Sequence, residues 1–122
     1  MNDSRRLVDK LWAYCDVLRD DGVGVIEYTE QLTYLLFLKM AEERATRRLA
    51  AERIVPEEYS WTRLLDASGA ELEKTYSDML AGLGREQGLI GTIFRKAQNR
   101  IQDPAKLRRL VVDLIDKEHW SS

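Results

Sequence analysis

The sequence contains too little cysteine and histidine for several kinds of site chemistry. Its 122 residues include one cysteine, Cys15, and one histidine, His119. A single cysteine excludes an internal disulfide and is typical of a reducing compartment. A lone histidine so far from the cysteine does not have the ligand spacing of a zinc site. We therefore expect a buried structural thiol at Cys15, a solvated His119, and neither a metal site nor a nucleophile.

Long apolar runs and a strong net charge are also absent. The most apolar segment, residues 32–41, is far shorter than the roughly 20 residues that a membrane-spanning helix needs. Residues 1–6 are polar and no apolar stretch of a signal peptide follows them. The net charge of −2 gives no overall attraction to DNA or to anionic lipid. We expect a soluble, cytoplasmic protein without membrane contact.

The sequence does contain helical spacing from end to end. Hydrophobic residues make up 44% and charged residues 33%, which is typical of one globular domain. The segment 32–41 is apolar on most sides, as in a helix at the middle of a fold, and we expect this central helix to run from about Glu27 to about Ala51. The sequence thus predicts an all-α fold, a single bundle of about five to six helices over residues 1–122.

Boundary signals separate the other expected helices. An apolar face of Leu7, Val8, Leu11, Trp12, Cys15 and Leu18 predicts a first helix that ends at residues 20–24. Pro56 ends the central helix, and Ser60 precedes a short turn with Trp61, Leu64 and Leu65. Ser68 and Glu71 have the spacing of a capping box and predict the start of a helix with buried Leu72, Tyr76, Met79, Leu80 and Leu83.

Two further helices complete the prediction. Gly82, Gly84 and Gly88 indicate a loose connection after the fourth helix. The fifth helix presents Leu89, Ile90, Ile93, Phe94, Ala97 and Ile101 on one side. Asp103 and Pro104 are typical of a helix start, because aspartate caps and proline lacks only an N–H that needs no helical partner. The sixth helix has a buried stripe of Leu107, Leu110, Val111, Leu114 and Ile115.

The glycine spacings match two nucleotide-binding patterns only superficially. The segment 82–88 has the glycines of a phosphate-binding loop, but a helix rather than a strand precedes it. Residues 88–91 match the G-x-x-G of an RNA-binding KH loop, but that fold needs strands that this sequence lacks. We assign neither function to the glycines.

Charge is distributed unevenly along the chain. Residues 92–109 contain six basic residues against the single acid Asp103, whereas residues 57–78 are mainly acidic. A basic stripe can follow a phosphate backbone on a weakly acidic protein, and amides can bond phosphate or sugar oxygens. The candidate DNA contacts are Arg95, Lys96, Gln98, Asn99, Arg100, Lys106, Arg108 and Arg109. The alternative is a solvated face on which Asp113 pairs with Arg109 and Lys117 at helical spacing.

Three sequence pieces, in this order and spacing, resemble the N-terminal helical domain of the modification subunit of type I restriction–modification systems. The pieces are Leu35-Leu36-Phe37-Leu38-Lys39-Met40, Gly91-Thr92-Ile93-Phe94, and Asp103-Pro104-Ala105-Lys106-Leu107 followed by Leu110-Val111-Val112-Asp113-Leu114-Ile115-Asp116. The resemblance extends from about Leu7 to Trp120, so it covers almost the whole chain. The single motifs are mostly core positions, and their combination carries the resemblance.

The resemblance implies a function for a longer parent protein. The full-length subunit of this family is an adenine-N6 DNA methyltransferase that uses S-adenosylmethionine. It works with a specificity subunit that reads the DNA sequence, with a second modification subunit and, in many systems, with a motor–nuclease restriction subunit. The helical N-terminal domain is implied to contact DNA and neighbouring subunits.

The catalytic signature of that family is missing here. It consists of Asn or Asp, two adjacent prolines and an aromatic residue, which together hold a flipped adenine. Pro56 and Pro104 are the only prolines and are not adjacent, and no glycine-rich cofactor loop follows a strand. We therefore expect no catalytic, cofactor-binding or metal residue in this chain, and S-adenosylmethionine only in the parent.

Two other classes remain open from the sequence. A free-standing helix-turn-helix regulator would use the junction at Gln102, Asp103 and Pro104 as its turn and Lys106, Arg108 and Arg109 as groove contacts. The sixth helix has no Asn or Gln in its first turns, which disfavours this reading. A purely protein-interacting helical bundle is the other alternative.

Overall fold

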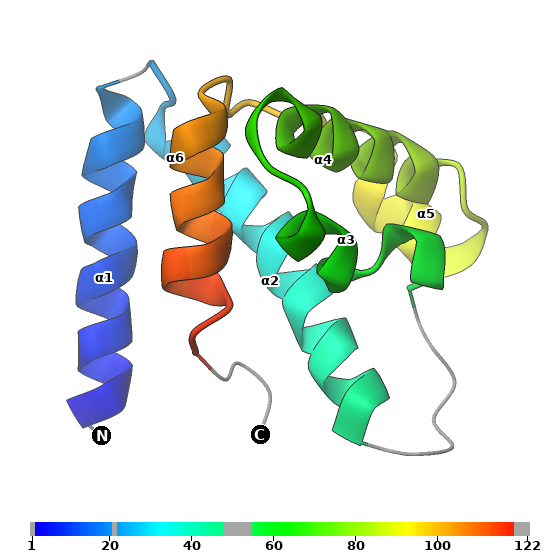
Figure 1. Cartoon of the computed structure of the whole chain (residues 1–122), viewed down its shortest axis with the longest axis horizontal. Coiled ribbons are helices and arrows are strands. Elements are labelled where there is room, and N and C mark those ends of the chain that lie inside the picture. Colours follow the sequence, from blue (N-terminus) through cyan, green and yellow to red (C-terminus); the bar gives the residue numbers. More distant parts are fainter. Residues whose placement is uncertain (1, 21, 48–54, 119–122) are drawn as a thin grey trace.

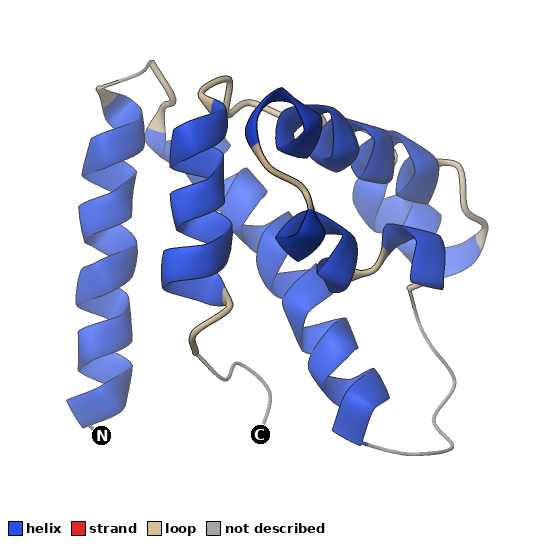
Figure 2. Ribbon diagram, in the orientation of Figure 1, coloured by secondary structure: helices blue, strands red, loops and turns tan. Residues whose placement is uncertain are grey.

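The protein is a bundle of helices. The computed structural model describes residues 2–20, 22–47 and 55–118, in which every regular element is helical (Figures 1 and 2). The α-helices are α1 (Asn2–Arg19), α2 (Val25–Arg47), α3 (Trp61–Asp66), α4 (Gly69–Gly84), α5 (Gly88–Phe94) and α6 (Pro104–Arg108). A 3-10 turn, η1 (Glu57–Tyr59), precedes α3, and α6 continues as the π-helical segment η2 (Arg109–Ile115). The predicted all-α fold is confirmed.

Helix α2 runs obliquely through the middle of the bundle (Figure 1). It contacts α1, α3 and η2. Leu35 and Leu38 are fully buried, whereas Leu36 and Phe37 are half-buried and Met40 is 37% exposed. The expected central apolar helix is therefore present, but it is not buried on all sides, because Met40 is exposed. Its predicted end near Ala51 lies outside the described residues.

A Schellman motif ends α1 at the glycine-rich stretch that the sequence indicated. The amide of Val23 donates to the Leu18 carbonyl at 3.1 Å, and the amide of Gly22 donates to the Arg19 carbonyl at 2.9 Å. Gly22 has a φ of 87°, which a residue with a side chain rarely adopts. Leu18 and Val23 are both buried, so the hydrophobic contact of this motif helps to set the turn into α2.

The predicted apolar face of α1 is only half correct. Cys15 and Leu18 are buried, as expected, and Cys15 is a free thiol. Val8 and Trp12 are 48% and 58% exposed. Val8 and Trp12 line an apolar hollow between α1 and α2 together with Val25, and the next residue of α2, Ile26, is also exposed. In the described residues no helix is long and apolar enough to cross a membrane.

The glycines of α4 serve close packing instead of a loose connection. Gly82 and Gly84 lie in the last turn of α4, where a β-carbon on Gly82 would meet the Tyr59 ring. A β-carbon on Gly84 would come within 2.7 Å of the Phe94 carbonyl oxygen. The expectation of a loose connection from these residues is wrong, because glycine is needed here for the approach of a neighbouring backbone and ring.

The starts of α4 and α6 were placed correctly, with one difference in capping. Asp103 caps α6 through its carboxylate, which accepts from the Ala105 amide at 2.9 Å, and Pro104 occupies the first helical position. Ser68 precedes α4 as predicted, but its side chain forms no capping hydrogen bond. Helix α4 therefore begins at the predicted position, but without the expected capping box. All five predicted stripe residues of α6 and η2 are buried.

Candidate nucleic-acid interface

The segment 95–103 contains most of the predicted DNA contacts, and it is not part of a helix. Helix α5 ends at Phe94, so the expected fifth helix to Ile101 is too long. The Asn99 side-chain oxygen accepts from the Ile101 amide at 2.8 Å, a local turn that competes with helix. Asp103 is extended, as a residue before proline prefers. The apolar spacing continued through this segment because Ile101 is buried in the core without being helical.

Aromatic packing fixes the point where this segment begins. The Phe94 ring is fully buried, with its centroid 5.4 Å from that of Tyr34 and 5.7 Å from that of Phe37. The Phe94 carbonyl lies against Gly84 at the end of α4. Arg95 and Lys96 follow directly and are exposed. Helices α2 and α4 thus set the position from which the first two cations project.

A buried hydrogen-bond chain holds the middle of the segment. The Gln31 side-chain amide donates to the Gln98 backbone carbonyl at 2.7 Å, and the Tyr76 hydroxyl donates to the Gln31 side-chain oxygen at 2.8 Å. Gln31 is 1% exposed and Tyr76 is fully buried. Burial of the Tyr76 phenol raises its pKa well above the ordinary value of 10, so it stays a neutral donor.

Sequence reasoning missed the role of Gln31. Its spacing from Leu35 and Leu38, one and two helical turns away, was the available signal, because it places Gln31 on the buried face of α2. Its partners at sequence separations of 67 and 45 residues gave no local signal.

The candidate residues beyond Asp103 follow α6 into η2. Arg108 and Arg109 are exposed and Lys106 is half-buried. The Arg108 guanidinium donates to the Ala67 carbonyl at 3.0 Å, so it is tied to the connection between α3 and α4. The considered pairs of Asp113 with Arg109 and Lys117 do not form among the described residues. Arg109 and Asp113 lie in the π-helical segment η2, where backbone bonds join residues five apart, and Lys117 lies beyond the end of that segment.

A polar hollow of about 580 Å³ lies beside this segment. It is lined by Gly22, Val23, Glu27, Asn99, Arg100, Gln102 and Asp103. The side chains of Gln98 and Arg100 are exposed, and Asn99 is half-buried with its side-chain oxygen already used by Ile101. Arg100 therefore lines this hollow together with the carboxylates of Glu27 and Asp103. Arg95 and Lys96 are not among its lining residues.

The helix-turn-helix alternative is wrong in its geometry. That motif joins two helices by a turn of three or four residues. Here nine residues, 95–103, separate α5 from α6, so Gln102, Asp103 and Pro104 do not form the turn of such a motif.

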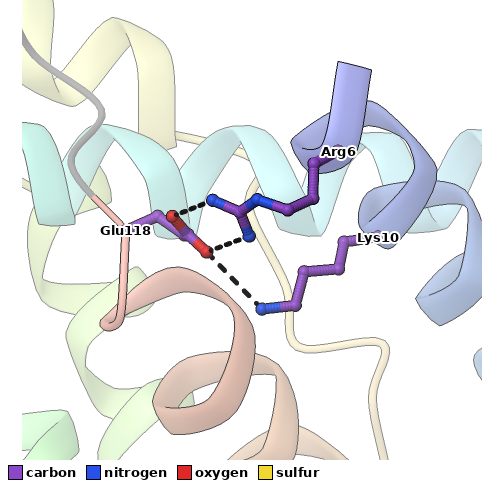
Figure 3. A network of polar contacts seen from close by, with 3 residues as sticks. All are labelled: Arg6, Lys10 and Glu118. Atoms are coloured by element: carbon purple, nitrogen blue, oxygen red, sulfur yellow. Dashed lines mark hydrogen bonds and ion pairs between the residues drawn. The ribbon is translucent and has the colours of Figure 1, made fainter. Parts of the chain in front are cut away.

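Ion pairs elsewhere serve the fold. Glu118 accepts from Arg6 at 2.9 and 3.1 Å and pairs with Lys10 at 3.5 Å, which ties α1 to the chain after η2 (Figure 3). The hydrogen bond from Arg6 lowers the pKa of Glu118. Asp116 accepts from the Trp61 indole at 2.9 Å and from Lys39 at 3.3 Å. The described part of the chain contains no group of three or more His, Cys, Asp or Glu able to hold a metal ion.

The fold and the site therefore define a helical domain with an ordered basic segment and no described metal centre. A protein-family model described as the HsdM N-terminal domain matches residues 7–114. The chain belongs to this family.

The relatives are methylase subunits of type I restriction enzymes. The chain is 36% identical over 115 residues to the StySPI subunit of Salmonella potsdam and to the EcoKI subunit of Escherichia coli K12. Each alignment covers 93% of this chain and 21% of the relative. The crystal structure of the EcoKI M protein matches with a TM-score of 0.77 and 34% identity, over 93% of this chain and 23% of that chain. The chain thus spans about a fifth of the length of these relatives, and the match supports the predicted all-α fold.

Proposed function

We propose that this domain contacts DNA and neighbouring subunits within a type I restriction–modification methyltransferase and performs no chemistry itself. The parent is proposed to transfer a methyl group from S-adenosylmethionine to adenine N6. Its partners are the specificity subunit, a second modification subunit and, in many systems, the motor–nuclease subunit, all in the cytoplasm. Family membership and the methylase relatives support this proposal.

One observation carries the DNA contact. Arg95, Lys96 and Arg100 project from a segment that the core holds in place, and none of the three forms an ion pair with another described residue. Because the backbone that carries these cations is already held, mainly side-chain entropy is lost when they meet phosphates, where they displace counterions. Arg108 and Arg109 extend the positive charge along α6 and η2.

The protein contact is proposed for a different face. Val8, Trp12, Val25 and Ile26 leave apolar surface exposed on α1 and α2. Apolar side chains gain nothing from phosphates, and apolar surface of this kind favours a protein partner. This face therefore supports the subunit half of the proposal, and the segment 95–103 supports the DNA half.

The test is a charge-matched comparison in the assembled methyltransferase. We expect R95E/R100E to weaken DNA binding and to flatten its dependence on salt, because fewer phosphates are neutralised. The control R5E/R19E makes the same change in net charge at exposed residues of α1. Equal affinity of the two variants, with an unchanged salt slope, would show that the segment 95–103 does not meet DNA.

A further inference from the structure

Gln31 is an unusual residue in the core of this bundle. Among the described residues, Gln31 and Ser60 are the polar residues that are buried below a few percent exposure. Both polar ends of the Gln31 side chain are used, one by Tyr76 of α4 and the other by the backbone of Gln98. A buried amide is tolerated only when such bonds are made, so Gln31 depends on both partners.

The backbone of Gln98 needs a partner because of where α5 ends. A carbonyl inside a longer helix would accept from an amide four residues on, but residues 97–103 are not helical. Gln31 supplies the missing donor from α2, at 2.7 Å. Ile101 adds an apolar anchor three residues later, fully inside the core. The segment is thus held at two points, one polar and one apolar.

We propose that Gln31 is a positioning residue for the DNA-contacting segment. Its amide fixes the backbone at Gln98, and Lys96 and Arg100 lie two residues to either side of that point. Gln31 is buried and does not itself touch DNA. It places the cations through the bond that its side-chain nitrogen donates to the Gln98 carbonyl, while its oxygen separately accepts from the Tyr76 hydroxyl. This inference rests on the proposed DNA contact.

The test compares Q31M, which removes both hydrogen bonds of the Gln31 side chain, with Y76F, which removes only the bond from Tyr76. Q31M keeps the length of the side chain but leaves both Tyr76 and the Gln98 carbonyl without a partner. Y76F removes the hydroxyl and keeps the donor from Gln31 to Gln98, so it is the matched control for general loss of stability. Q31M, Y76F and, as a third single variant, R100E are each made in the full 122-residue chain. Each is measured well below its own melting temperature.

Two readouts separate positioning from stability. Amide hydrogen exchange over residues 97–102 reports the segment directly, and we expect Q31M to speed it about tenfold, the equivalent of one lost hydrogen bond. NMR titration with a short DNA duplex at low salt reports binding. We expect Q31M to weaken it by a factor of about three to ten, and Y76F to leave both readouts close to the original protein.

The outcomes distinguish the two proposals. If R100E leaves duplex binding unchanged, the DNA contact itself is wrong. If R100E weakens binding but Q31M does not, or if Y76F weakens it as much as Q31M, Gln31 has no positioning role. Unchanged exchange over residues 97–102 in Q31M also overturns the inference.

Discussion

Leu35 and Leu38 are the side chains on which α2 depends. They are 0% and 1% exposed, while Met40 on the same helix is 37% exposed. Truncating either leucine to alanine should cost about 2–5 kcal/mol of unfolding free energy, because a cavity remains in a packed core. Met40→Ala is the matched control and should cost much less. Chemical denaturation of the three variants checks this, and equal midpoints would mean that α2 is not the buried helix.

Glu118 gives the fold a dependence on acid. Its bond with Arg6 lowers its pKa from the ordinary value of 4.5, so the ionised carboxylate stabilises the folded state above that value. This contribution is lost as the pH falls through the lowered pKa of the folded state. We expect the difference in melting temperature between the original protein and E118Q to be largest near neutral pH and to shrink below pH about 4. A difference that stays constant with pH would contradict the ion pair shown in Figure 3.

The junction of α4 and α5 depends on a glycine. A β-carbon on Gly84 would lie 2.7 Å from the Phe94 carbonyl oxygen, which belongs to backbone and cannot swing aside. Gly84→Ala should therefore cost about 1–3 kcal/mol, as overpacking does. Gly24→Ala is the control, because the atom in its way is the far end of the flexible Glu27 side chain. Thermal unfolding should separate the two variants, and an unshifted Gly84→Ala would refute the close approach.

The same junction shows what sequence periodicity can and cannot predict. Apolar spacing together with a breaker or a cap predicted the end of α1 and the starts of α2, α4 and α6 to within about two residues. It extended α5 past Phe94 because Ala97 and Ile101 continue the helical spacing, although Ile101 is buried by a turn. The spacing of apolar residues records burial, not backbone conformation. Gly84 likewise predicted a loose loop after the fourth helix, but it lies inside α4 and allows the Phe94 backbone to pack closely against it.

The candidate site was predictable only in its charges. Arg95, Lys96 and Arg100 are visible in the sequence, but the chain from Tyr76 through Gln31 to Gln98 joins residues 45 and 67 positions apart. Such contacts depend on how α2 and α4 pack, which no local pattern encodes. The two points that hold the segment, at the Gln98 backbone and at Ile101, are therefore visible only in the folded structure.

The division of labour proposed for the parent protein makes a prediction about the domain as a whole. The chain corresponds to about a fifth of the methylase relatives and lacks the Pro-Pro motif and the glycine-rich cofactor loop of the family. The hollow beside the segment 95–103 has a mainly polar lining that includes the carboxylates of Glu27 and Asp103, which does not suit an adenine ring. We therefore expect isothermal titration of the 122-residue chain with S-adenosylmethionine to give no saturable heat, while the full-length subunit binds it under the same buffer. Saturable one-site binding by the chain alone would place part of the cofactor site in this bundle and end its assignment as a purely positioning domain.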